Sequence, residues 1–159
     1  MKRMGIFALG AAGYSCIEIA VRGYTHWTMT LLGGACLLFL CRLERAAPRR
    51  PLPAAAALGA AGITAAELAV GLIVNRMLGW GVWDYTHEAF DLLGQICPKF
   101  RAFWDALCLA LFAAMRAARA GARRVRAALF ARKASRAAQP AALRLPAPQP
   151  GAPPAEKAS

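Results

Sequence analysis

Long apolar runs interrupted by a single carboxylate are the feature that most constrains this chain. Residues Met4–Val21 contain one charged side chain, Glu18, and Leu52–Val74 likewise contain only Glu67. A helix rises about 1.5 Å per residue, so each run can cross or nearly cross a hydrocarbon layer of about 30 Å. A soluble domain would instead alternate apolar and polar residues to keep one face in water. We therefore expect an all-α membrane protein.

Two further apolar segments complete a predicted bundle of four transmembrane helices. Thr25–Cys41 carries no charge but is short for a span, and Ala102–Met115, which carries Asp105, is shorter still. We interpret the shorter one as a span lengthened by the arginines that follow it, whose long stems reach toward the headgroups. The predicted transmembrane domain covers residues 1–115. A basic amphipathic segment (116–138) should follow, either as a membrane-surface helix or as a frayed soluble one, and the Pro- and Ala-rich tail (139–159) should be disordered.

The chain also contains an internal repeat. Two pairs of segments match in the same order: YTHWTMTLLGGAC (Tyr24–Cys36) with YTHEAFDLLGQIC (Tyr85–Cys97), and GYSCIEIAV (Gly13–Val21) with GITAAELAV (Gly62–Val70). Each half, about 4–45 and 52–115, holds two spans, which predicts parallel repeats related by an axis along the membrane normal. The second half has the longer outer stretch, Gly79–Phe100, for which we expect a short interfacial or re-entrant helix.

Charge placement predicts the orientation. The formal net charge of +12 belongs mostly to the segment that begins at Arg116. Basic residues favour the cytoplasmic side, so both termini should be cytoplasmic in a multi-pass protein of the inner membrane. The four tryptophans then fall at the outer boundary, where aromatic residues are enriched: Trp27, Trp80, Trp83 and Trp104. Beside four spans, we expect the basic segment to bind anionic lipid rather than nucleic acid.

The repeat places the two lone carboxylates at the same depth. A carboxylate inside a span is costly unless it is paired or lines a wet cavity, so it is a functional hypothesis by default. Arg22 follows Glu18 by one helical turn, but Gly71 stands at the matching place after Glu67. A purely structural role, joining helices, is almost as well favoured. The candidate polar or transport site comprises Glu18, Arg22, His26, Glu67, Trp83, Asp84, Tyr85, His87 and Gln95.

The two histidines of the repeat leave two interpretations open. With Asp84 and Glu88 nearby, His26 and His87 are suited to a metal or a proton relay, but we favour helix caps or bonds to backbone carbonyls. The five cysteines show neither zinc spacing nor a CxxC pair, so we predict no metal, no cofactor and no disulfide framework. These spacings assemble no nucleophile with a base, and we expect no enzyme.

Several of these residues together carry a resemblance to a known family. They are Gly13, Glu18, Arg22 and Gly23, then HWT (His26–Thr28), WDY (Trp83–Tyr85) and LLGQIC (Leu92–Cys97). On them the chain resembles the CmpB-like ABC-transporter permease family, also called type IV, of small multi-pass bacterial membrane proteins. The likeness covers about Gly5–Met115 and leaves out the tail.

The resemblance implies a permease subunit for a small solute. The chain has no GxxxxGK[ST] phosphate loop, so such a role requires a separate ATPase subunit, and four spans make self-association a further expectation. The alternative is a structural or regulatory membrane subunit with no transport activity of its own.

Overall fold

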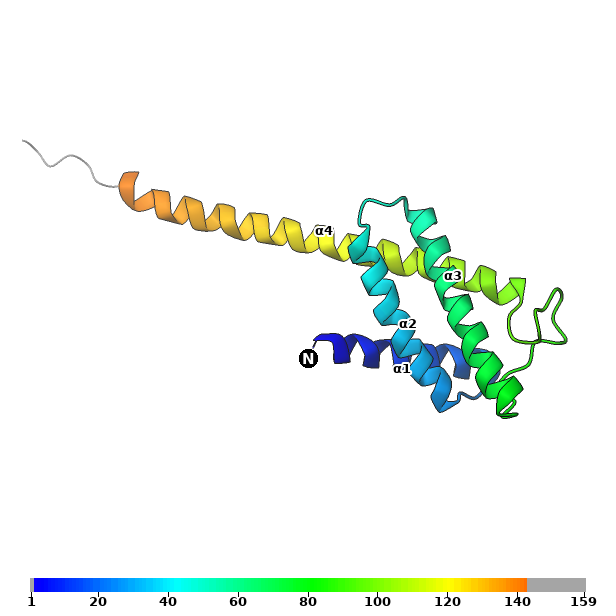
Figure 1. Cartoon of the computed structure of the whole chain (residues 1–159). Coiled ribbons are helices and arrows are strands. Elements are labelled where there is room, and N and C mark those ends of the chain that lie inside the picture. The colour runs from blue at the N-terminus through cyan, green and yellow to red at the C-terminus, as the bar shows by residue number, and fades with distance from the viewer. Residues whose placement is uncertain (1, 143–159) are drawn as a thin grey trace, which may run out of the picture. The chain divides into compact units, whose positions relative to one another are not determined.

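The computed structural model describes residues 2–142, and their side chains up to residue 136. The elements in chain order are α1 (Lys2–Arg22), α2 (Trp27–Ala46), α3 (Leu52–Gly71), the π-helix η1 (Leu72–Met77), which continues α3, and α4 (Pro98–Ala142) (Figure 1). The described residues contain no strand beyond one isolated bridge between Leu92 and Ile96. The chain divides into two units, Met1–Arg116 and Ala117–Ser159, and each is described by itself below.

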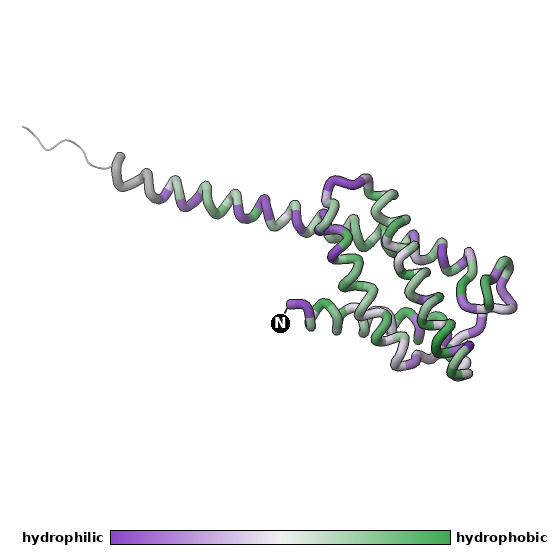
Figure 2. Tube along the Cα trace, in the orientation of Figure 1, coloured by the Kyte–Doolittle hydropathy of each residue, from purple (hydrophilic) through white to green (hydrophobic). Residues whose placement is uncertain are grey.

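Three helices are long and apolar enough to cross a membrane: α1, α2 and the continuous stretch Leu52–Met77. Figure 2 shows their apolar middles and the polar residues at their ends. The start of α4 does not meet the same criterion, because Lys99, Arg101 and Asp105 lie within its first turns. The first three predicted spans are therefore matched by helices of spanning length and composition, and the fourth stays a prediction.

Glycines bring α1 and α2 into close contact. A Cβ added at Gly33 would lie 2.2 Å from the Cβ of Tyr14, and one at Gly10 would lie 2.6 Å from the carbonyl oxygen of Gly33. Gly34 accommodates the ring of Phe7 in the same way. Small residues let helix backbones approach in an apolar environment, where packing and hydrogen bonds replace the hydrophobic effect. A hydrogen bond of 2.8 Å between the hydroxyls of Ser15 and Thr30 adds to this contact.

The first turns of α4 complete the core of the N-terminal unit. The helix begins at Pro98, where a fixed φ suits the first helical position and the missing N–H costs nothing. Phe112 and Cys108 are fully buried, and both lie against Gly59 of α3. The sulfur of Met115 accepts a hydrogen bond from Cys41 of α2 at 3.9 Å. Large side chains from α4 thus fill the space that glycine and alanine leave on α3.

The outer segment between η1 and α4 is not the helix that the sequence predicted. It consists of turns, with positive φ at Phe90 (57°), Leu93 (56°) and Gly94 (69°). The two copies of the Leu-Leu-Gly motif therefore differ: residues 31–33 lie inside α2, whereas residues 92–94 form a turn closed by the hydrogen bond from the Gln95 N–H to the Leu92 carbonyl. Left-handed backbone is incompatible with a continuing right-handed helix, so this copy cannot form one.

The helix α4 runs further than the basic segment predicted for residues 116–138. It is helical to Ala142, so the predicted disordered tail (139–159) begins too early, and its residues from 143 onward lie outside the described part of the chain. Within the second unit, every described side chain is exposed from Gly121 to Arg136. Alanine and arginine are both good helix formers, which accounts for the unbroken helix.

Candidate functional site: a buried carboxylate cluster

Glu67 joins three helices through its carboxylate. It lies in the last turns of α3 with 5% of its surface exposed. One oxygen accepts a hydrogen bond of 2.8 Å from the Tyr14 hydroxyl of α1, and the other accepts one of 2.8 Å from the Trp104 indole N–H of α4. The rings of Tyr14 and Trp104 stack with centroids 5.4 Å apart. Both donors are neutral, so the charge of an ionised Glu67 has no cation among its hydrogen-bond partners.

Glu18 is also buried, but its partners include a cation. The Arg22 guanidinium donates to one carboxylate oxygen at 2.8 Å, and the Thr25 hydroxyl donates to the other at 2.8 Å. Arg22 also donates to the Val82 carbonyl at 2.6 Å and to the Tyr24 hydroxyl at 2.8 Å. The end of α1, the turn before α2 and the outer segment are thereby held together.

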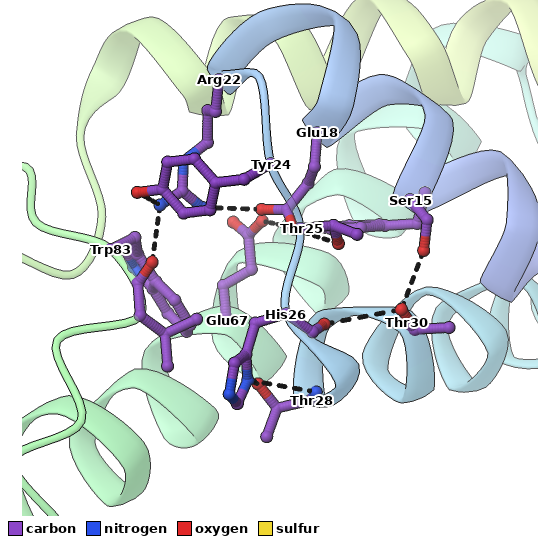
Figure 3. Close-up of polar contacts among 12 residues, drawn as sticks. Ser15, Glu18, Arg22, Tyr24, Thr25, His26, Thr28, Thr30, Glu67 and Trp83 are labelled. Carbon is purple, nitrogen blue, oxygen red and sulfur yellow. Dashed lines mark hydrogen bonds and ion pairs between the residues drawn. The ribbon is translucent and has the colours of Figure 1, made fainter.

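The two carboxylates belong to one cluster. In Figure 3 the side chains of Glu18 and Glu67 point from α1 and α3 toward the same region, and their charges repel each other. The repeat-based prediction brought these two residues together with Arg22, and the structure places all three in this cluster. Glu18 is paired with the Arg22 cation, whereas Glu67 has only neutral donors. When all three groups are ionised, the cluster therefore carries a net negative charge.

A small cavity lies beside the cluster. Its volume is about 50 Å³, which accommodates a few water molecules at most. It is lined by Tyr14, Ile17, Glu18, Val21, Arg22, Tyr85, Phe100, Phe103 and Trp104. Tyr85 stacks on Phe100 with centroids 4.7 Å apart. Burial, and after it the charge of Glu67, raise the pKa of the Tyr85 hydroxyl above its ordinary value, so this group remains a donor at neutral pH.

Asn75 organises the outer segment, and the sequence analysis missed it. Its side-chain oxygen accepts from the Val82 N–H at 2.7 Å, while its amide donates to the Trp83 carbonyl at 3.0 Å and to the Gln95 side-chain oxygen at 2.8 Å. It lies in η1, and π-helical turns often occur at functional positions. The one sequence signal was an amide inside an otherwise apolar run that ends before the outer segment.

The outer segment packs against α3 at Gly71. The Trp83 indole donates to the Gln95 carbonyl at 3.0 Å, and both side chains are buried. A Cβ at Gly71 would lie 2.3 Å from the Gln95 side-chain oxygen and 2.8 Å from the Trp83 ring. Trp83 and Gln95, both on the list of candidate residues, therefore pack against α3 one turn after Glu67. A side chain in place of Gly71 would exclude them.

The histidines and Asp84 occupy different surroundings. His26 is the N-cap of α2: its ring nitrogen lies 2.8 Å from the Thr28 hydroxyl and accepts from the Thr28 N–H at 3.4 Å, which confirms the helix-cap interpretation for this residue. His87 is exposed in a turn and caps no helix. Asp84 accepts from the Thr86 N–H at 2.9 Å, and this bond lowers the pKa of its carboxyl.

No group of three or more metal-ligating side chains occurs among the described residues. Of the four tryptophans expected at the membrane boundary, Trp27 and Trp80 are exposed and pack against His26. Trp83 and Trp104 are buried instead, because each indole N–H finds an acceptor inside the unit.

A second buried ion pair was missed by the sequence analysis. Glu44, with 1% of its surface exposed, accepts two hydrogen bonds from the Arg116 guanidinium, at 2.9 and 3.0 Å. Glu44 lies near the end of α2, which continues to Ala46 and leaves only residues 47–51 between the helices. The pair connects the end of α2 with α4, and only tertiary structure shows it.

The fold and the cluster define a helical membrane protein with acidic groups in its core. Comparison with known families identifies it more closely: residues 28–129 match the family described as "Putative ABC-transporter type IV", and the chain belongs to that family. No curated protein and no solved structure matches the chain. The match starts after Gly13, Glu18 and Arg22, which had contributed to the resemblance, and it reaches beyond Met115 into the basic helix that the resemblance had left out.

Proposed function

We propose that this chain is a permease-type membrane subunit of an ABC transporter for a small solute and that it works with a separate ATPase subunit. The membership in a family of ABC-transporter type and the apolar helices support a membrane role in such an assembly. The missing phosphate loop supports a separate ATPase. We attribute no catalysis to the chain itself.

The observation that carries the proposal is Glu67. A carboxylate inside a membrane helix that is held by two neutral donors is costly to keep ionised, and such groups mark substrate or ion paths. A group of this kind can change its interactions when helices move, because Tyr14 and Trp104 come from different helices. We propose that relative motion of these helices opens and closes the region beside the cluster.

We keep the arrangement in the membrane that the sequence predicts as part of this proposal. We propose that Phe100–Met115 of α4 forms a fourth span, that the two halves are parallel repeats and that both termini are cytoplasmic. The cavity of about 50 Å³ is too small for most solutes, so a complete path requires a second copy of the chain or another subunit. The inner membrane remains our proposed location.

A structural or regulatory subunit is the second candidate, and one observation favours it. Each carboxylate oxygen of Glu18 and Glu67 already has a partner within the protein. A fully paired polar cluster rigidifies a core and fixes one packing arrangement. In that case the cluster would join helices and would not contact a solute.

Substitution of Glu67 by glutamine separates the two candidates. Glutamine keeps the shape and an oxygen for Trp104 but removes the charge, so the fold should tolerate it. The tagged full chain is isolated from its native membrane in mild detergent, and its amount, the co-purifying subunits and the ATPase activity of the complex are measured. Glu88→Gln is the matched control, since Glu88 forms only an exposed ion pair with Lys99.

The permease proposal predicts normal amounts of the Glu67→Gln protein and of its complex but a loss of at least tenfold in ATPase activity coupled to transport. A structural role predicts less protein in the membrane, with the remaining complex fully active. Isolation of the intact chain without any ATPase subunit would contradict the proposal as a whole.

A further inference from the structure

The second unit carries an unbroken positive charge. No acidic residue occurs between Asp105 and Glu156, while residues 117–136 contain seven basic ones: Arg119, Arg123, Arg124, Arg126, Arg132, Lys133 and Arg136. The stretch from Arg123 to Arg136 thus combines six basic residues with no carboxylate. A segment of this composition attracts a polyanion or an anionic surface.

Four exposed residues share one face of this helix. Arg126, Leu129, Phe130 and Lys133 follow the spacing i, i+3, i+4, i+7, and they line a shallow hollow on the helix surface. Leu129 is 59% and Phe130 71% exposed, which is unfavourable in water for two large apolar side chains. The face thus has an apolar centre between two basic ends.

We propose that this face of α4, Arg126–Leu129–Phe130–Lys133, binds acidic phospholipids at the membrane surface. The basic ends pair with headgroup phosphates, and the apolar centre enters the glycerol region, where a partly buried amphipathic helix is stable. A nucleic acid or an acidic protein surface would match the charges but would leave Leu129 and Phe130 without an apolar partner.

The chain connectivity favours the lipid further. Arg126 follows Arg116 by ten helical residues, a reach of about 15 Å at most. Given the proposed fourth span, Arg116 lies where the chain leaves the hydrocarbon. The attraction of an anionic leaflet extends over about one Debye length, roughly 10 Å at 0.1 M salt, so Arg126 lies near its range, and the residues beyond it come into range when the helix lies along the surface.

The test compares the full chain in two kinds of nanodisc. One contains phosphatidylcholine only, and the other also contains about one third phosphatidylglycerol. Hydrogen exchange of the backbone amides from residue 117 to residue 136 is measured by mass spectrometry, because an isolated helix of this length frays in water and a bound one is protected. Exchange should slow several-fold in the anionic discs, and the protection should disappear at high salt.

Two matched variants test the face itself. Arg126→Gln with Lys133→Gln removes two charges from it, whereas Arg124→Gln with Arg132→Gln removes two from elsewhere on the helix circumference. At about 1 kcal/mol per basic residue at an anionic surface, the first pair should weaken binding roughly 30-fold. The control pair, farther from the surface by up to a helix diameter, should stay within about threefold of the unaltered chain.

A third variant tests the apolar centre. Leu129→Ser with Phe130→Ser keeps all charges and should still lose most of the protection. Equal exchange in the two lipid compositions would overturn the proposal, as would an equal loss in both charge variants. Protection that arises only after addition of RNA or of an acidic partner protein would assign the helix to that class instead. None of these outcomes depends on ATPase activity or on Glu67.

Discussion

Replacing Gly33 by alanine should separate α1 from α2. The added Cβ would lie 2.2 Å from the Cβ of Tyr14 and 2.9 Å from the carbonyl oxygen of Gly10. A Cβ and a backbone carbonyl cannot move away by a change of rotamer. The backbones of the two helices must therefore shift by more than an ångström to restore ordinary contact distances.

The cost has two parts. Overpacking of a rigid site destabilises by about 1–3 kcal/mol. A shift of Tyr14 also disturbs its 2.8 Å hydrogen bond to the buried Glu67 carboxylate, a bond of a kind that contributes about 1.5–3 kcal/mol. Together the substitution should lower the free energy of unfolding by about 3–5 kcal/mol. For a unit of this size the corresponding decrease in Tm is roughly 10–20 °C.

The measurement is thermal unfolding of the purified full chain in detergent, followed by tryptophan fluorescence. Gly13→Ala is the control, because a Cβ at Gly13 meets nothing within 4 Å. The control should leave Tm unchanged or raise it slightly, since alanine is the better helix former. If both variants unfold at the same temperature, the close approach of α1 and α2 is wrong.

Three further outcomes are expected. Arg116→Met should destabilise the protein by about 3 kcal/mol, because it leaves the buried Glu44 carboxylate without its bidentate partner, and Glu44→Gln should cost less. A double-mutant cycle in thermal unfolding measures the coupling energy between the two residues, and additive effects would contradict the ion pair. Asn75→Ala should destabilise by about 1–3 kcal/mol and expose Trp83 to a soluble quencher, whereas unchanged quenching would exclude its organising role. Asp84 has a lowered pKa in the folded state. Its contribution to the free energy of unfolding is therefore present above the ordinary aspartate pKa and is lost as pH falls through the lowered value. Titration of its carboxyl at the ordinary value, measured by NMR, would refute this.

The helices could be predicted from sequence because their signal is local. Met4–Val21 and Leu52–Val74 contain enough apolar residues in succession to specify spanning helices without knowledge of their neighbours. The end of the third helix was less accurate: η1 extends it to Met77, since Asn75 satisfies its side-chain amide in the outer segment and Arg76 is exposed. The fourth span stays a prediction, because charged and apolar residues mix in the first turns of α4.

The site was only partly predictable, since most of its contacts are tertiary. The repeat brought Glu18 and Glu67 together, but it gave no information on Tyr14 or Trp104, which appear in the sequence as ordinary aromatic residues. A short interfacial or re-entrant helix was predicted for the outer segment, which consists of turns. Its turns depend on Asn75, a residue outside the matched segment.

The difference between the two copies is the reason why our transport proposal rests on Glu67 and not on Glu18. In the first copy Arg22 occupies the position one turn after Glu18 and forms a 2.8 Å ion pair with it. In the second copy that position is Gly71, and the Gln95 side-chain oxygen and the Trp83 ring fill the space that a side chain would need. An arginine cannot be introduced there without expelling the outer segment. Glu67 is thus kept without a cation by the same packing that orders the outer segment, so any motion that displaces this segment also changes the surroundings of the carboxylate.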